Sequence, residues 1–166
     1  MLFELKSVFL NDGETKKCSY GLELADLEID GIFPFVSPVT VTAEASNRAS
    51  LVTLTLRCQY SFIRPCDRCG TPVQDVEEKC FTHPLVQELV DERNDDYIET
   101  PDFILELDEI VISDLILNYS QKFLCREDCK GLCPKCGKNL NDGMCDCNRT
   151  QTDARLEILR QFMENE

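Results

Sequence analysis

Polar and apolar residues alternate in the first third of the chain, which is the pattern of a half-buried β-strand. The alternation runs through residues 39–45 and again through 51–60, with turn-forming residues at 46–49 between them. The sequence therefore predicts a β-hairpin, followed by a further strand at 73–81. The second strand of the hairpin would place five residues on one face: Val52, Leu54, Leu56, Cys58 and Tyr60.

The pattern then changes from strand-like to helical. Residues 84–101 mix acidic residues with few apolar ones, which indicates an acidic loop with a short helix at 84–90. A short strand is expected at 103–107, followed by a helix over 108–122 for which Asp108 is the expected N-cap. Apolar residues recur through that helix at helical spacing, so we expect it to be largely buried.

These elements predict an α+β fold, in which an antiparallel β-sheet or partial barrel packs on one buried helix. This domain would cover residues 1–124. A small cysteine-rich module would follow at 125–166 and end in an amphipathic helix over 153–162, capped by Asp153. Hydrophobic residues make up 43% of the 166 residues, which is enough for a packed core.

The eleven cysteines are many for the compartment that the sequence indicates. No stretch approaches the roughly 18 apolar residues that cross a membrane, and residues 1–6 do not begin a signal peptide. We therefore expect a soluble, cytoplasmic protein with no membrane partner. Disulfides are rare in that compartment, where clustered cysteines usually indicate metal or redox chemistry.

Six of the cysteines fall within residues 125–147. Cys133-Pro-Lys-Cys136-Gly has the form of a zinc knuckle, because the two-residue spacing lets both sulfurs reach one metal and the glycine permits a tight turn. Cys145 and Cys147 return after an Asn-Asp-Gly turn and can complete a four-thiolate site. The spacing therefore predicts a small zinc-bound C-terminal module.

A second pair, Cys66-Asp-Arg-Cys69-Gly, follows the predicted hairpin. A thioredoxin-like pair would open a helix, whereas residues 70–72 lead towards another strand. The natural partners of this pair are Cys125 and Cys129, which would give two four-cysteine sites and two zinc ions per chain. A single site with spare thiols is the alternative, and an iron–sulfur cluster can also use four cysteines.

The remaining candidates for chemistry do not indicate an enzyme. Cys18, Cys58 and Cys80 stand alone and are expected to be buried apolar thiols. The one histidine, His83, follows Cys80 by three residues, but no orienting motif supports a nucleophile pair. The chain has no glycine-rich phosphate-binding motif, and all-thiolate zinc sites are normally closed and structural. We therefore expect no catalytic activity and no small-molecule substrate.

The net charge of −14 is concentrated in one segment. Residues 75–109 carry thirteen acidic side chains against Lys79 and Arg93, a net charge of −11. One interpretation is a solvated acidic loop. Another is a surface that attracts a basic partner and repels phosphate. The residues expected to form that surface are Asp91, Glu92, Asp95 and Asp96.

The cysteine-rich end resembles the YceD family in the run from Cys125 to Asn141, in Cys145-Asp-Cys147 and in Asp153-Ala-Arg155, where the family often has Asp-Pro-Arg. The pair at 66–69 is similar to that family's other marker. Members are called large ribosomal RNA subunit accumulation proteins. The resemblance implies a role in the synthesis, processing or stability of 23S ribosomal RNA, and an association with a small zinc-binding protein of the large subunit. It implies no catalytic activity.

Two direct partners remain open, 23S rRNA and a ribosomal protein of the large subunit. Charge favours the ribosomal protein, because thiolate zinc sites add further negative charge to an acidic chain. A redox or metal-handling cysteine protein is the alternative function. The basic residues available for contacts with rRNA phosphates are Arg64, Arg68, Lys130, Lys135, Lys138 and Arg149.

Overall fold

The computed structural model describes residues 1–88, 96–120 and 122–147. The chain forms two compact units. Unit 1 comprises Met1–Arg64 and Pro72–Phe123, and unit 2 comprises Pro65–Thr71 and the described residues from Leu124 onward. Unit 2 therefore draws its residues from both sides of residue 124, where the sequence analysis places a domain boundary.

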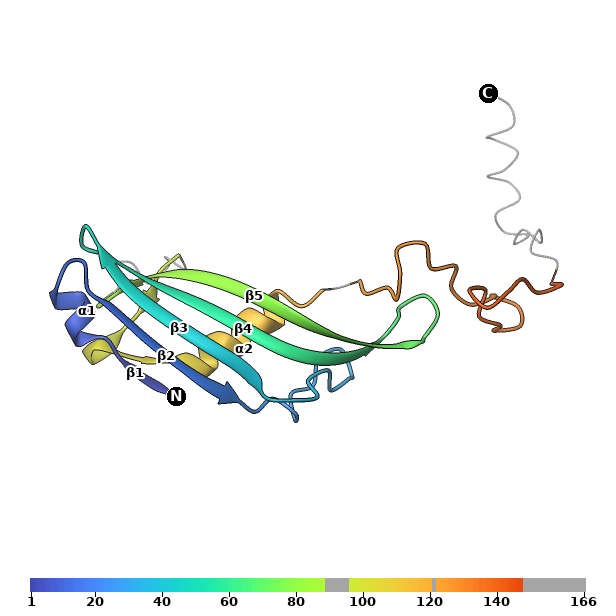
Figure 1. Cartoon of the computed structure of the whole chain (residues 1–166), viewed down its shortest axis with the longest axis horizontal. Coiled ribbons are helices and arrows are strands. Elements are labelled where there is room, and N and C mark those ends of the chain that lie inside the picture. The colour runs from blue at the N-terminus through green and yellow to red at the C-terminus, as the bar shows by residue number, and fades with distance from the viewer. Residues whose placement is uncertain (89–95, 121, 148–166) are drawn as a thin grey trace, which may run out of the picture. The chain divides into compact units, whose positions relative to one another are not determined.

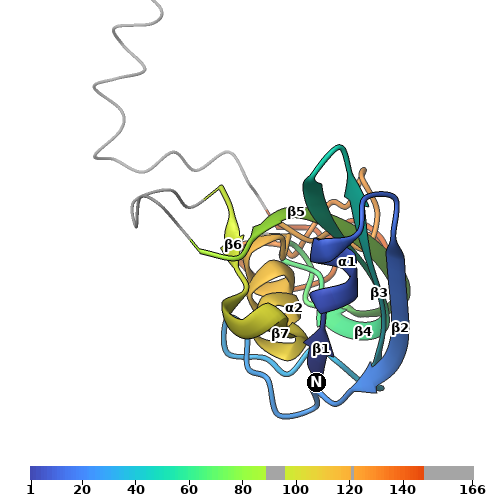
Figure 2. The same ribbon diagram turned by 90° about the vertical axis from the view of Figure 1, so that its left-hand side faces the viewer.

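Unit 1 is built on a five-stranded sheet in the order β2-β3-β4-β5-β6 (Figures 1 and 2). Strands β2, β3 and β4 pair antiparallel, and β6 pairs parallel to β5. A separate antiparallel pair joins β1 (Leu2–Glu4) to β7 (Ile104–Glu106). The strands of the larger sheet are β2 (Thr15–Leu22), β3 (Val39–Arg48), β4 (Leu51–Pro65), β5 (Pro72–Val86) and β6 (Ile98–Glu99).

The predicted hairpin is confirmed by the antiparallel pairing of β3 with β4, in which Val41 lies opposite Cys58. All five residues predicted on one face of β4 are buried. The predicted turn at 46–49 is wrong over residues 46–48, which remain paired in β3. The turn consists of Ala49 and Ser50, whose φ angles of 53° and 63° suit the two-residue turn that joins twisted strands.

Helix α2 (Leu107–Leu117) covers one face of the sheet (Figure 2). Its burial is as expected, with Leu107, Val111 and Leu115 in the core. The predicted bounds of 108–122 are wrong at both ends. The helix begins at Leu107 because that side chain is fully buried, so Asp108 lies in the first turn and is not the cap. It ends at Leu117, with Asn118 as the C-terminal cap.

The segment between β5 and α2 also differs from expectation. The predicted helix at 84–90 is wrong over residues 84–86, which continue β5 because Leu85 is buried there and pairs with Ile98. The short helix η1 (Pro101–Phe103) precedes β7, which is shorter than the strand predicted at 103–107. Residues 89–95 and the predicted terminal helix at 153–162 lie outside the described residues.

The core of unit 1 lies between the sheet and the helices α1 (Lys6–Leu10) and α2. Alternate residues of β3 and β4 supply the sheet's contribution, and Val8 of α1 is fully buried. The amide group of Asn47 donates a 2.8 Å hydrogen bond to the carbonyl of Val8, which ties α1 to β3. No helix among the described residues combines the length and the apolar character needed to cross a membrane.

We expect Leu56→Ala to lower the free energy of unfolding of unit 1 by about 2–5 kcal/mol, because Leu56 is fully buried and truncation leaves a cavity. Leu51→Ala, on the same strand, is the matched control and should cost less than about 1 kcal/mol, since Leu51 is 51% exposed. Urea unfolding followed by circular dichroism measures both, because the chain has no tryptophan. Equal losses would contradict the described orientation of β4.

Candidate metal centre

Unit 2 gathers eight of the eleven cysteines into two groups of four, with the same membership as the sequence-based hypothesis. Within each group the sulfur atoms lie within 4.8 Å of one another. We call the group that begins with Cys66 the first quartet and the group that begins with Cys133 the second quartet. The first quartet is Cys66, Cys69, Cys125 and Cys129; the second is Cys133, Cys136, Cys145 and Cys147.

The sulfur separations in the first quartet fit a tetrahedral metal. Cys66 Sγ lies 3.8 Å from Cys129 Sγ, and Cys69 Sγ lies 3.7 Å from Cys125 Sγ. Metal–sulfur bonds of about 2.3 Å in a tetrahedron place the sulfur atoms about 3.8 Å apart. A disulfide would instead bring two sulfur atoms to about 2 Å. The quartet therefore has the geometry of four ligands around one ion.

The two Cys-x-x-Cys-Gly turns have the same backbone geometry. Cys66 N–H donates to the Thr71 carbonyl at 2.9 Å, and Cys133 N–H donates to the Lys138 carbonyl at 2.8 Å, five residues ahead in both cases. The glycine four residues after each leading cysteine donates back to that cysteine's carbonyl, at 2.8 and 2.9 Å. Both glycines have φ near +70°, which explains why the motif requires glycine.

Hydrogen bonds within unit 2 fix its second chain segment and join that segment to the first. Asn141 Nδ2 donates to Cys129 Sγ at 3.3 Å, while its Oδ1 accepts from the Lys130 N–H at 2.9 Å. Arg68 donates to the Cys129 carbonyl at 2.8 Å. Gly131 has φ +72°, and a Cβ there would approach the Arg68 carbonyl to 3.0 Å, so glycine is needed at this crossing. Sequence reasoning missed Gly131, because its role depends on a contact with a distant segment, and it missed Asn141, whose partners lie 11 and 12 residues earlier in the same segment.

The first quartet combines thiols of different acidity. Burial raises the pKa of the Cys66 thiol, but hydrogen bonds, chiefly from the Cys125 backbone, outweigh burial and bring the pKa down to about 6. Burial and proton sharing with neighbouring thiols raise the pKa of Cys125 to about 12. Cys66 therefore ionises more readily than Cys125, which holds its proton more tightly than a free thiol does. Binding of a metal would release that proton, because a metal ligates the thiolate.

The second quartet shows the same division and is more open to solvent. Backbone N–H groups of Cys136 and Lys135 lower the pKa of Cys133. A hydrogen bond with Cys136, together with burial, raises the pKa of Cys147 to about 12. Cys133 is buried, whereas Cys136 is exposed and the other two are half-buried. The first quartet has three buried members, so it is the better shielded of the two.

The three cysteines outside the quartets differ in environment. Cys58 is buried and burial raises its pKa to about 12, whereas Cys18 is half-buried. The expectation of burial is wrong for Cys80, which is exposed because it lies on the outer face of β5. His83 lies on the other face of that strand, where its Nε2 contacts Asp114 Oδ2 at 2.8 Å. Cys80 and His83 therefore point away from each other.

The candidate rRNA contacts lie in both units. Arg64 is 6% exposed within unit 1, where its guanidinium donates a hydrogen bond to the Ser120 carbonyl. The charged group of Arg64 is therefore used in packing within that unit. Arg149 lies outside the described residues. The others are exposed residues of unit 2: Arg68, Lys130, Lys135 and Lys138.

The acidic residues do not all project from one loop. Asp75, Glu77 and Glu78 belong to β5, while Asp108 and Glu109 belong to α2. Of the four residues proposed as a partner surface, Asp96 is exposed. The other three, Asp91, Glu92 and Asp95, lie outside the described residues.

Residues 54–163 match the family model described as large ribosomal RNA subunit accumulation protein YceD. The chain belongs to the YceD family. The matched span contains both quartets of the metal centre, and it confirms the resemblance seen in the sequence. The family's name points to the accumulation of large-subunit ribosomal RNA.

A relative from Arabidopsis thaliana carries the same family name: "Large ribosomal RNA subunit accumulation protein YCED homolog 1, chloroplastic". It is 28% identical to this YceD-family chain over 165 residues, an alignment that covers 80% of the chain and 51% of the relative. The chain thus spans about half the length of that curated relative. No solved structure matches the chain at a significant level.

We expect the purified protein to bind two metal ions per chain, one in each quartet. Cys66→Ser and Cys133→Ser should each remove one ion, because a structural site that loses one of its four thiolates holds its metal far more weakly. Native mass spectrometry counts the bound ions. Cys80→Ser is the matched control, since this exposed thiol lies outside both quartets, and it should retain two. A parent protein with one ion would contradict the two-site arrangement.

Proposed function

We propose that the chain is a non-enzymatic, cytoplasmic factor in large ribosomal subunit biogenesis, which supports 23S rRNA synthesis, processing or accumulation by holding a basic ribosomal protein. The observation that carries the proposal is the YceD family match over residues 54–163. The acidic charge of the chain supports the choice of a protein partner, and the two quartets support a structural use of metal.

The metal in both quartets is zinc, and its role is structural. Four thiolates fill a tetrahedral coordination shell and leave no open position for a substrate or an activated water. The few large apolar residues of unit 2 also favour this role. Among the residues of this unit that the structure describes, the buried hydrophobic ones are cysteines together with Leu140, so metal ligation would supply much of the folding energy.

Metal analysis tests the identity of the ion. Inductively coupled plasma mass spectrometry should return zinc as the predominant metal in protein purified without added metal, and the protein should be colourless. Predominant iron with visible absorbance would show iron ligation and overturn the zinc assignment. Removal of zinc by a chelator should make unit 2 sensitive to proteolysis while β3 and β4 of unit 1 stay protected.

The charge distribution favours a basic protein over RNA as the direct partner. The net charge is −14. When the eight thiols ionise to form two four-thiolate zinc sites, the net charge of the protein becomes more negative still. An acidic chain repels the phosphate backbone unless its basic residues gather on one face. Ribosomal proteins that bind rRNA carry the opposite charge, so an acidic factor can hold such a protein before it meets its RNA site.

A tagged pull-down from a ribosome-producing lysate, with and without RNase, tests the direct partner. Under the proposal, one or more large-subunit ribosomal proteins stay attached after RNase treatment. Complete loss of ribosomal proteins after RNase would show that RNA is the bridge, and it would contradict direct protein capture.

Neutralisation of the candidate acidic surface should weaken that capture. Binding through exposed charges is steeply dependent on salt, because such charges are screened beyond about 8 Å at physiological ionic strength. The retained fraction of ribosomal protein, measured across a salt series, should therefore fall in the acidic variant while the zinc content stays at the parent value. The variant replaces Asp91 and Asp95 with Asn, Glu92 with Gln, and Asp96 with Asn.

The paired control is Lys135→Ala with Lys138→Ala on unit 2. Replacement of these exposed lysines should weaken binding to RNA and leave binding to a basic protein unchanged. If only the lysine pair changes the retained material, direct RNA binding replaces the acidic-surface mechanism.

A further inference from the structure

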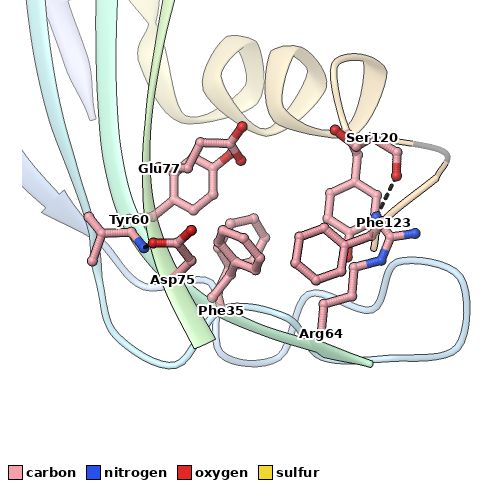
Figure 3. Close-up of a pocket in the computed structure, with 10 residues that line it drawn as sticks. Phe35, Tyr60, Arg64, Asp75, Glu77, Ser120 and Phe123 are labelled. Carbon is pink, nitrogen blue, oxygen red and sulfur yellow. Dashed lines mark hydrogen bonds between the residues drawn. The ribbon is translucent and has the colours of Figure 1, made fainter. Parts of the chain in front are cut away.

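A pocket of about 190 Å³ opens on unit 1 beyond the end of helix α2 (Figure 3). Its position follows from element lengths. The 11 residues of α2 extend about 16 Å, whereas the 15 residues of β4 and of β5 extend about 50 Å. The helix therefore cannot cover the whole inner face of the sheet. The wall of the pocket that lies across from the sheet is formed by residues that follow α2, namely Tyr119, Ser120 and Phe123.

Aromatic rings line much of this pocket. Phe35 and Tyr60 pack edge to face with ring centroids 5.3 Å apart, and Phe62 packs in the same way on Phe123 at 5.4 Å. Phe35, Tyr60 and Phe62 are each less than 10% exposed, so packing fixes the orientation of these rings. Ring faces carry negative electrostatic potential and attract cations.

Two carboxylates from β5, Asp75 and Glu77, complete the lining. Glu77 accepts a 2.9 Å hydrogen bond from the Tyr60 hydroxyl, and it forms a 2.7 Å ion pair with Lys79. Burial and that hydrogen bond raise the pKa of Tyr60, so its hydroxyl keeps its proton and donates. Asp75 is exposed, and within the described chain its carboxylate accepts only from the neighbouring Val76 N–H, at 2.8 Å.

The one cation in the lining, Arg64, is already engaged at the other side of the pocket. Its guanidinium stacks 4.6 Å from the Tyr119 ring and 5.4 Å from the Phe123 ring, and it donates to the Ser120 carbonyl. Figure 3 shows this group on the far side of Phe35 from the Asp75 carboxylate. Arg64 also shows what these walls can bind, because a guanidinium already lies against two of their rings.

We propose that this pocket binds an arginine side chain of a basic protein partner. The guanidinium lies against the aromatic rings that line the pocket and pairs with the Asp75 carboxylate. The inference rests on the proposed function, because it assumes a basic protein as the partner. It adds the site and the kind of side chain that is recognised.

Size and charge select this occupant. Pockets for small molecules usually measure about 300–1,000 Å³, so about 190 Å³ suits one side chain better than a nucleotide. Asp75 would repel a phosphate, whereas the charge of Glu77 is already balanced by Lys79. A planar guanidinium can stack on a ring and bond a carboxylate at the same time, which the compact ammonium of lysine does less well.

The test uses ¹⁵N-labelled full-length protein, titrated with a hexa-arginine peptide and followed by two-dimensional NMR. Binding in the pocket should shift the amide signals of Phe35, Asp75 and Val76. Asp75→Asn should weaken binding at these signals by about fivefold, as expected for the loss of one partly exposed cation–carboxylate contact. Hexa-lysine should shift the same signals at several-fold higher concentration.

Glu78→Gln is the matched control. It removes one negative charge from the same strand, but Glu78 lies on the outer face, where it pairs with Arg57 at 3.9 Å. This variant should bind hexa-arginine at the pocket signals as the parent does. Equal weakening by Asp75→Asn and Glu78→Gln would show attraction by overall charge and would overturn the proposal. Equal shifts with hexa-lysine, or pocket shifts caused by single-stranded oligouridine, would overturn it as well.

The same variants in the RNase-treated pull-down separate the two proposals. If the parent retains ribosomal proteins and Asp75→Asn retains them equally, the pocket inference fails while the proposed function stands. If the parent retains none but hexa-arginine still binds at the pocket signals in the predicted way, the proposed function fails while the arginine site stands.

Discussion

The convergence of Cys66 and Cys69 on Cys125 and Cys129 is the constraint on which the organisation of this chain depends. It joins segments that lie 63 residues apart, the turn between β4 and β5 and the chain that follows α2, in one compact unit. Four thiols held at this spacing repel one another once they ionise, and a bound cation would relieve that repulsion. The backbone N–H groups directed at the sulfurs serve the same end.

Unit 1 is stabilised in a different way. Its core is apolar, and it is formed by alternate residues of long strands and by one short, buried helix. Because the strands extend past the helix, the inner face of the sheet changes character along β5, from Leu85 in the core to Asp75 at the pocket. The uncovered part is shaped by packed aromatic rings and has carboxylates at its edge. A pocket of this kind results from the mismatch in length, with no need for a flexible element.

These features support the binding role that we propose. The quartets can fix the shape of unit 2 without an open coordination position, and the pocket of unit 1 contains carboxylates that already act as acceptors. His83 of β5 and Asp114 in the C-terminal half of α2 contact each other, and Cys80 lies on the opposite face of the strand. The name of the YceD family points to the accumulation of large-subunit ribosomal RNA, and the acidic charge supports the chemistry of the partner that we propose.

The sequence by itself determined the features that depend on local spacing. Alternation placed the inward face of β4, and the Cys-x-x-Cys-Gly spacing identified both cysteine turns of the candidate metal centre, because strand period and knuckle geometry each involve only a few neighbouring residues. Features that depend on packing between distant segments were decided by the tertiary structure. The start of α2 at Leu107 reflects burial in the core, and the continuation of β5 to Val86 reflects pairing with β6. Burial of Arg64 likewise required Tyr119 and Phe123, which no local pattern places beside it.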